Sequence, residues 1–173
     1  MKICMILPSL STGGTERVVM NLSRYLCKQN HEVHLVIFKN IVKFQIDAPL
    51  KLHLLAKKNA KTLKALIASL EAKSQPFDYI YSHSLGSLAK KAKLPNRYYV
   101  FHNPISVSLE KGFVLTKFLR KLKLKWRYDH ENIITVSKGL TEDLLAHGFK
   151  PKSIHTIYNP FDFEHIINES KQQ

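Results

Sequence analysis

The sequence is poor in cysteine, in acidic residues and in long hydrophobic runs. Its cysteines are Cys4 and Cys27, too few for a disulfide framework or a zinc site, and they fit a reducing compartment. No apolar run approaches the roughly 18 residues needed to cross a bilayer, and Met1-Lys2 leads into an apolar segment instead of a signal peptide. We therefore expect a cytoplasmic protein whose membrane association, if any, is peripheral.

The shortage of acidic residues leaves the chain strongly basic. Only 13 aspartates and glutamates accompany 27 lysines and arginines, for a formal net charge of +14. This charge favours nucleic acid, an anionic membrane surface or phosphorylated substrates as partners, and charge alone does not choose among them. With 45% hydrophobic residues, the 173-residue chain suits one domain with a core and excludes disorder.

Strand and helix patterns alternate along the chain. Short apolar runs predict strands at 3–7, 33–38, 51–55, 79–82, 98–101, 133–136 and 153–158. Helical spacing of apolar residues predicts helices between them, the first running from near Thr15 to Gln29-Asn30. This alternation is typical of an α/β fold with a parallel sheet.

A glycine turn separates the first predicted strand from the first helix. Gly13-Gly14 lets backbone amides crowd toward the helix N-terminus, where unpaired N–H groups and the positive dipole end favour a phosphate. Alternatively, the glycines simply make a turn, and Ser11, Thr12 or Thr15 caps the helix. The loop matches neither the dinucleotide fingerprint nor the phosphate loop with its Gly-Lys-Ser/Thr, so both of those classes are excluded.

Polar residues also follow three later strands. His83-Ser84 comes after the fourth strand and His102-Asn103 after the fifth, while Ser137 precedes a helix that it is expected to cap. Ligands of open α/β sheets bind at such strand ends. The absence of a Gly-x-Ser-x-Gly elbow argues against a hydrolase, and the histidine spacing predicts no metal site.

A basic amphipathic helix between residues 112 and 130 interrupts the alternation. One face carries the apolar residues Leu115, Phe118, Leu119, Leu122 and Trp126. The rest carries the basic residues Lys117, Arg120, Lys121, Lys123, Lys125 and Arg127. Such a helix, with Trp126 in its apolar face, suits an anionic membrane surface. Two alternatives are that the apolar face packs on the domain's own sheet, or that the charges bind nucleic acid, for which no recognised motif is present.

Taken in order, these features resemble the N-terminal domain of the retaining, nucleotide-sugar-dependent glycosyltransferases built from two facing Rossmann-like domains, called glycosyltransferase group 1. Besides the basic helix, the resemblance rests on Gly13-Gly14-Thr15-Glu16-Arg17-Val18, His83-Ser84, His102-Asn103, Val136-Ser137 and Ile157-Tyr158-Asn159-Pro160-Phe161-Asp162. It implies a Rossmann-like sheet of about seven strands with helices on both faces. It also implies an acceptor-side domain over residues 1–158, followed over 159–173 by a hinge and the truncated start of a second domain.

The resemblance further implies transfer of a sugar from a nucleotide diphosphate donor, with retention and with neither metal nor cofactor. Gly13, Gly14 and Thr15 would approach the donor phosphates, and His102 would be the catalytic histidine near the reacting sugar. Ser11, His83, Asn103 and Ser137 would contact the acceptor, although Asn103 stands where the family more often has Asp or Gly.

Charge and resemblance together indicate a membrane-associated glycolipid acceptor. We expect growth of lipopolysaccharide core or a lipid-linked glycan at the inner face of a bacterial plasma membrane, with the basic helix on anionic lipid and no nucleic acid partner. Because the donor-binding half is missing, the chain alone is expected to be inactive. The alternative is a non-catalytic α/β module that binds membrane or nucleic acid.

Overall fold

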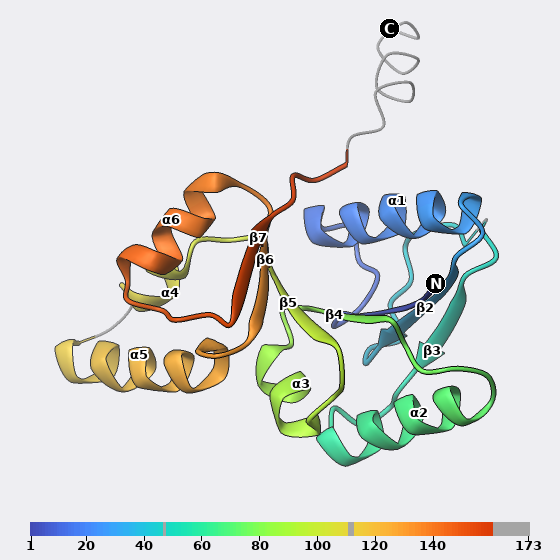
Figure 1. The fold of residues 1–173 in the computed structure, drawn as a ribbon, viewed down its shortest axis with the longest axis horizontal. Coiled ribbons are helices and arrows are strands. Elements are labelled where there is room, and N and C mark those ends of the chain that lie inside the picture. The colour runs from blue at the N-terminus through green and yellow to red at the C-terminus, as the bar shows by residue number, and fades with distance from the viewer. Residues whose placement is uncertain (47, 111–112, 161–173) are drawn as a thin grey trace, which may run out of the picture.

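Seven parallel strands form one sheet in the order β3-β2-β1-β4-β5-β6-β7 (Figure 1). The computed structural model describes residues 1–46, 48–110 and 113–160. The strands are β1 (Lys2–Ile6), β2 (Glu32–Ile37), β3 (Lys51–Leu54), β4 (Tyr79–His83), β5 (Arg97–Phe101), β6 (Asn132–Thr135) and β7 (Ser153–Thr156). All of the strands predicted from the apolar runs are confirmed, with ends displaced by at most two residues.

Helices connect the strands on both faces of the sheet, as predicted. They are α1 (Gly14–Lys28), α2 (Ala60–Ala72), α3 (Gly86–Ala92), α4 (Ile105–Leu109), α5 (Val114–Tyr128) and α6 (Lys138–Ala146). The short α4 was not predicted; its first amides donate to the Asp143 carboxylate of α6, Ile105 N at 2.5 Å and Ser106 N at 3.2 Å. That tertiary contact compensates for the absence of a local cap.

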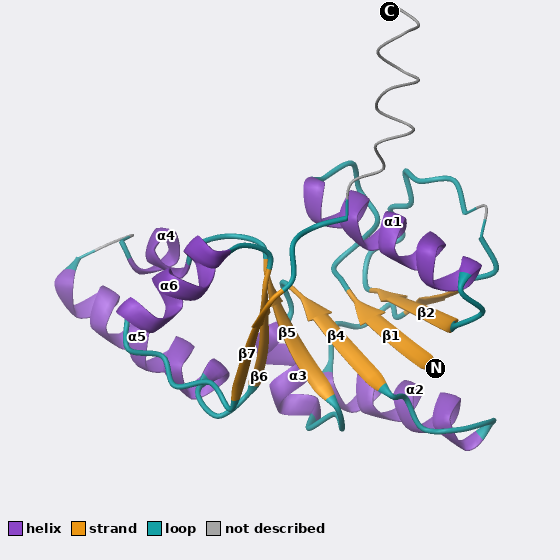
Figure 2. Ribbon diagram, turned by 45° about the horizontal axis from the view of Figure 1, so that its top comes forward, coloured by secondary structure: helices purple, strands orange, loops and turns teal. Residues whose placement is uncertain are grey.

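The two sides of the sheet are covered unequally (Figure 2). Ile3 and Met5 of β1 pack in a cluster with α1, whereas their neighbours Cys4 and Ile6 pack with α2. Side chains alternate along a strand, and right-handed crossovers change sides when the strand order reverses between β1 and β4. The clusters accordingly place α1 on one face and α2 to α6 on the other.

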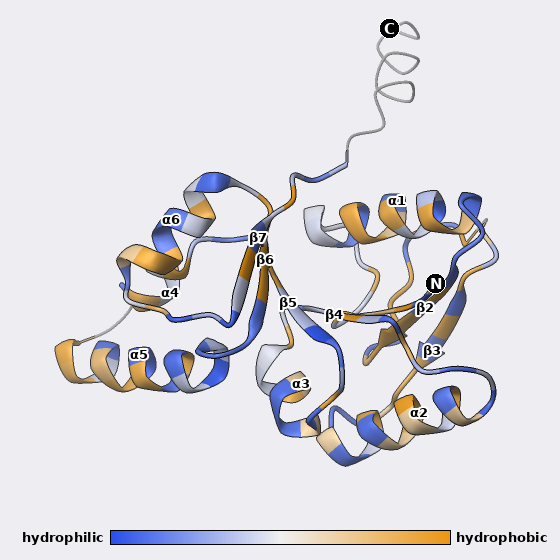
Figure 3. Ribbon diagram, in the orientation of Figure 1, coloured by the Kyte–Doolittle hydropathy of each residue, from blue (hydrophilic) through white to orange (hydrophobic). Residues whose placement is uncertain are grey.

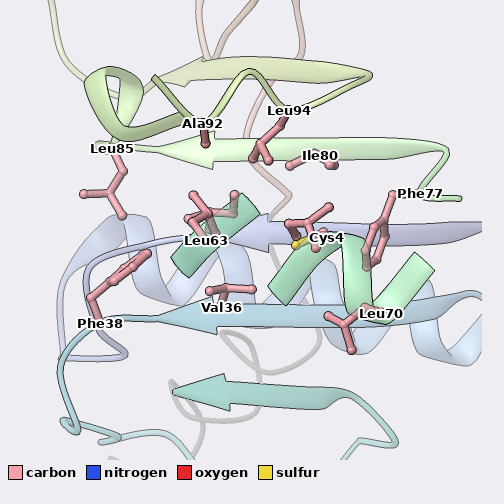
Figure 4. Packing of buried hydrophobic residues seen from close by; sticks show 12 residues of the cluster. Cys4, Val36, Phe38, Leu63, Leu70, Phe77, Ile80, Leu85, Ala92 and Leu94 are labelled. Carbon is pink, nitrogen blue, oxygen red and sulfur yellow. The ribbon is translucent and has the colours of Figure 1, made fainter. Parts of the chain in front are cut away.

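The core beneath α2 contains a buried cation. Lys2 is fully buried, and its ammonium donates to the Leu70 carbonyl at 2.6 Å, the Ser74 hydroxyl at 2.9 Å and the Gln75 carbonyl at 2.9 Å. It also lies 4.6 Å from the centre of the Phe77 ring, which packs in the cluster shown in Figure 4. These three acceptors use every ammonium proton, so the C-terminal end of α2 is held to the first residue of β1.

Helix α5 turns its apolar face away from the domain. The side chains predicted to share that face are 48–70% exposed, namely Leu115, Phe118, Leu119, Leu122 and Trp126. Leu124, which the prediction left out of the apolar face, is the buried residue of the helix. The alternative that this face packs on the domain's own sheet is therefore wrong, and α5 lies at the edge of the molecule with its hydrophobic residues visible in Figure 3.

Two predictions concern the ends of the described chain. The proposed hinge and second-domain start at 159–173 fall outside the described residues from 161 onward, as does Gly112, where the basic helix was expected to begin. Within the described ranges, no helix is both long enough and apolar enough to cross a membrane.

Candidate functional site at the carboxyl edge of the sheet

The glycine turn after β1 leaves the start of α1 without a side-chain cap. Gly13 is the N-cap residue in extended conformation, and no side chain accepts a capping hydrogen bond there among the described residues. The alternative that Ser11, Thr12 or Thr15 caps this helix is therefore wrong. The first amides of α1 remain oriented toward the carboxyl edge of the sheet, where an anion would bind favourably.

Glu16, which the sequence analysis quoted only within a motif, occupies this turn. Its carboxylate accepts a hydrogen bond from the Ser11 hydroxyl at 3.0 Å, and its charge favours the first turn of the helix. A Cβ atom on Gly13 would come within 2.4 Å of the Glu16 Oε2 atom, whereas Gly14 has open space around it. Glycine at position 13 therefore makes room for the carboxylate in the conformation that it adopts here.

Two histidines meet at the same edge of the sheet. His83 ends β4 and His102 follows β5; His83 Nδ1 and His102 Nε2 are 2.9 Å apart, and their rings stack with centroids 5.2 Å apart. One nitrogen of this pair donates and the other accepts. The sequence analysis predicted both residues at one edge, but the hydrogen bond between residues 19 positions apart depends on the pairing of β4 with β5.

Burial keeps the histidine pair neutral. Desolvation, followed by the influence of His102, lowers the pKa of His83 to about 3. Desolvation also lowers the pKa of His102, against an opposing effect of the Glu16 carboxylate. The His83 Nε2 atom is buried and has no hydrogen-bond partner in the described part of the chain. The pair can thus exchange hydrogen bonds with a hydroxyl group at neutral pH.

The histidine pair lines a groove of about 400 Å³ on the side of the sheet that α1 covers incompletely. The walls are mostly apolar and aromatic and include Val18, Leu22 and Tyr25 of α1, with Tyr79, Tyr81, Val100 and Ile134 of the sheet. The groove exists because α1 lies over β1 and β2 while no described helix covers β4 to β6 on this side.

The remaining predicted acceptor residues lie in different places. Ser11 binds Glu16, and Asn103 lines a separate cavity on the opposite side of the sheet edge. Ser137 caps α6, where its hydroxyl accepts from Leu140 N at 3.4 Å, and it lines neither the groove nor that cavity. The expected capping role of Ser137 is confirmed, while its contact with an acceptor stays a prediction.

The basic residues of α5 divide into two groups. Lys125 binds the Gly148 carbonyl and the Asp129 carboxylate, the latter at 3.0 Å, and the Arg120 guanidinium donates to the Ser108 carbonyl at 2.9 Å. Lys117 and Lys123 are exposed. The contacts with Ser108 and Gly148 were not visible in the helical pattern, because they depend on α4 and on the loop after α6.

Acid conditions should destabilise the fold through His83. Its folded-state pKa lies far below the unfolded value of 6.5, so stability is complete above pH 6.5 and decreases as the pH falls toward 3. Chemical unfolding at pH 7.5 and 5.5 should show His83→Gln losing less stability than the parent, by about 1.4 kcal/mol, because one pH unit of this interval lies below 6.5. The exposed His155→Gln should keep the parental pH dependence; equal pH dependence in His83→Gln and the parent would contradict the assignment.

Fold and site together define a class of protein. A doubly wound parallel sheet with a glycine turn at the switch point and polar groups at the carboxyl edge is a Rossmann-like ligand-binding domain. A sequence profile described as Glycosyltransferase Family 4 matches residues 12–165, and the chain belongs to this family. No curated protein sequence gives a significant match.

Solved structures confirm the fold. Sucrose-phosphate synthase from Thermosynechococcus elongatus superimposes with a TM-score of 0.58 at 14% identity, covering 91% of this chain and 47% of that protein. An alpha-glucosyltransferase in complex with UDP and a DNA 13-mer gives a TM-score of 0.58 at 16% identity, covering 97% of this chain and 44% of that protein. The chain therefore spans about half the length of the structures it matches.

Proposed function

We propose that the chain is the acceptor-side half of a retaining glycosyltransferase that uses a nucleotide diphosphate sugar. The observation that carries this proposal is the neutral His83–His102 pair at the carboxyl edge of a Glycosyltransferase Family 4 domain. The UDP present in the alpha-glucosyltransferase complex supports a nucleotide diphosphate donor.

The chemistry assigned to each group follows from its position. Negative charge develops on the diphosphate as it leaves, and the uncapped amides of Gly14 and Thr15 at the start of α1 would stabilise that charge. His102, neutral and held by His83, would hydrogen-bond a hydroxyl of the donor sugar or of the acceptor. We assign no protein nucleophile, metal or cofactor to the reaction.

The donor-binding half of the site would come from a second domain. Because the chain spans 47% and 44% of the two similar structures, we expect residues 1–173 alone to show negligible sugar transfer. A protein that joins this chain to a second Rossmann-like domain should consume the nucleotide sugar and form glycosylated lipid. Robust turnover by residues 1–173 alone, or no turnover by the two-domain protein, would contradict the proposal.

We further propose a membrane-associated glycolipid as the acceptor, at the inner face of a bacterial plasma membrane. The exposed apolar face of α5, from Leu115 to Trp126, supports this proposal, because water-exposed apolar surface of this kind marks interaction sites. Lys117, Lys121 and Lys123 flank that face without an acidic residue on the helix. An amphipathic helix of this composition binds anionic lipid with its apolar side in the headgroup boundary.

The chain should therefore bind vesicles that contain anionic lipid at low salt. Reversing Lys117, Lys121 and Lys123 to glutamate should weaken binding at least about 100-fold, since losing three basic residues at about 1 kcal/mol each already accounts for that factor. Lys125 is left unchanged because it holds Asp129 and Gly148. Co-sedimentation measures the effect.

Apolar variants separate insertion of α5 from charge attraction alone. Phe118→Ser combined with Trp126→Ser should also abolish co-sedimentation, whereas Leu145→Ser combined with Ile41→Ser removes exposed apolar residues elsewhere and should not. Parental binding by the lysine reversal, or an equal loss in both serine pairs, would show that α5 is not the membrane contact.

A further inference from the structure

A second, polar cavity lies on the side of the sheet opposite α1, between the carboxyl ends of β4 and β5 and helix α5. Its volume is about 190 Å³, and its polar lining includes Ser82, Ser84, His102, Asn103, Ser108 and Arg127. Pockets for whole small ligands usually measure roughly 300–1,000 Å³. This cavity therefore suits one chemical group of a larger ligand.

Two polar atoms in its lining are buried without partners. Ser82 is 2% exposed, and its hydroxyl forms no hydrogen bond with any described residue. The Arg127 Nε atom is likewise buried and unpaired within the described ranges. Folded proteins pair nearly all buried polar groups, so a serine hydroxyl and an arginine Nε atom left unpaired on two residues that line one cavity indicate a ligand that accepts hydrogen bonds from both.

The residues around the cavity indicate that this ligand carries negative charge. A neighbouring hollow of about 490 Å³ is lined by Arg120 and Lys123 of α5 and shares Ser108, Leu124 and Arg127 with the first cavity. None of the described residues that line either space is acidic. Arg120, Lys123 and Arg127 follow one another at helical spacing. They form a row of positive charge along α5 that leads an anion to the cavity.

Arg127 is positioned by packing. A Cβ atom on Gly86 would come within 3.0 Å of the Arg127 Cδ atom and within 2.7 Å of the Tyr128 hydroxyl, so the glycine provides the space in which both side chains lie. The guanidinium carbon also lies 5.6 Å from the centre of the Tyr128 ring. A side chain held in this way loses little freedom when it binds an oxyanion.

We propose that this cavity binds one phosphate group of the acceptor, with Arg127 and Ser82 as donors and Lys123 at its entrance. A phosphate offers enough acceptor oxygens to satisfy the buried hydroxyl and the guanidinium at once. His102 lines both this cavity and the apolar groove, so a phosphate bound here would place the acceptor beside the proposed catalytic residue. The acceptor part of this inference rests on the proposed function.

Titration of the isotopically labelled chain with methyl phosphate, followed by nuclear magnetic resonance, tests the site directly. The amides of Ser82, Ser84 and Asn103 should shift, and Arg127→Gln should weaken binding at least tenfold. Ser82→Ala should weaken it severalfold through loss of one donor. Lys64→Gln, an equal change of charge at an exposed position on α2, should bind as the parent does.

Three outcomes would overturn the proposal: parental affinity in both Arg127→Gln and Ser82→Ala, shifts confined to Gly14 and Thr15, or tighter binding of acetate than of methyl phosphate, which would indicate a carboxylate. Backbone spectra of the variants report whether they fold. If Arg127→Gln does not fold, Ser82→Ala still tests the site, because it removes only one atom. The titration needs no donor and no turnover. If phosphate binds in the cavity but the two-domain protein has no transferase activity, the phosphate site is supported and the proposed function is rejected.

Discussion

Replacing His102 by alanine is expected to lower kcat/KM for sugar transfer by roughly 10²- to 10⁴-fold in a protein that joins this chain to its donor domain, the range of a positioned proton-transfer group. The alanine removes a neutral imidazole that accepts or donates at 2.9 Å to His83 and lies within the influence of Glu16. The loss should appear mainly in kcat, because the interaction is assigned to the reacting hydroxyl.

The matched control is His155→Ala, which removes an exposed imidazole from β7 and should leave kcat and KM unchanged. His83→Gln gives an independent readout, since a group that only orients His102 should alter the pH profile of kcat more than it alters KM. If His102→Ala kept at least half of the parental kcat/KM, the histidine pair would not be the reaction centre.

Replacing Phe77 by alanine is expected to lower the free energy of unfolding by about 3–5 kcal/mol. Phe77 is fully buried, packs in the cluster beneath α2, and meets the His34 ring edge-on with centroids 5.1 Å apart. Its ring also supports the buried Lys2 ammonium. The truncation would leave a cavity in the packing of Figure 4 and remove the aromatic face from that cation.

Urea unfolding measures this loss, which is a large fraction of the stability of a domain. Phe113→Ala makes the same change at a side chain that is 86% exposed and should stay within about 0.5 kcal/mol of the parent. Equal stability of the two variants would mean that Phe77 does not support the core in the way the packing indicates.

Most of the fold was predictable because its central strands β1 and β2 are buried on both faces and the others also appear as short apolar runs. Strand β2 shows this: the predicted 33–38 is Glu32–Ile37 in the structure. Helix α4 was missed because its first amides are satisfied by Asp143, which lies 37 and 38 positions away in sequence. Lys2 was interpreted as the head of a strand, and only the fold shows that the end of α2 surrounds it.

The candidate site was predictable in composition and not in geometry. The residue types after β1, β4 and β5 placed Gly13, His83 and His102 at one edge, because parallel strands end on the same side. Their contacts were not accessible in this way. The hydrogen bond between His83 and His102 depends on the register in which β4 pairs with β5.

Sequence alone therefore determined the order of strands and helices along the chain except for α4, the basic charge of α5 and the residue types at the carboxyl edge, because these follow from local periodicity and composition. Tertiary structure decided which surfaces are covered. The same period that marks Phe118 and Leu122 as one apolar face cannot say whether a partner lies against it, and the structure leaves it exposed while Leu124 packs inward. It also decided that His83 meets His102 and that Ser82 and Arg127 share a cavity, since both depend on strand pairing and helix placement between distant parts of the chain.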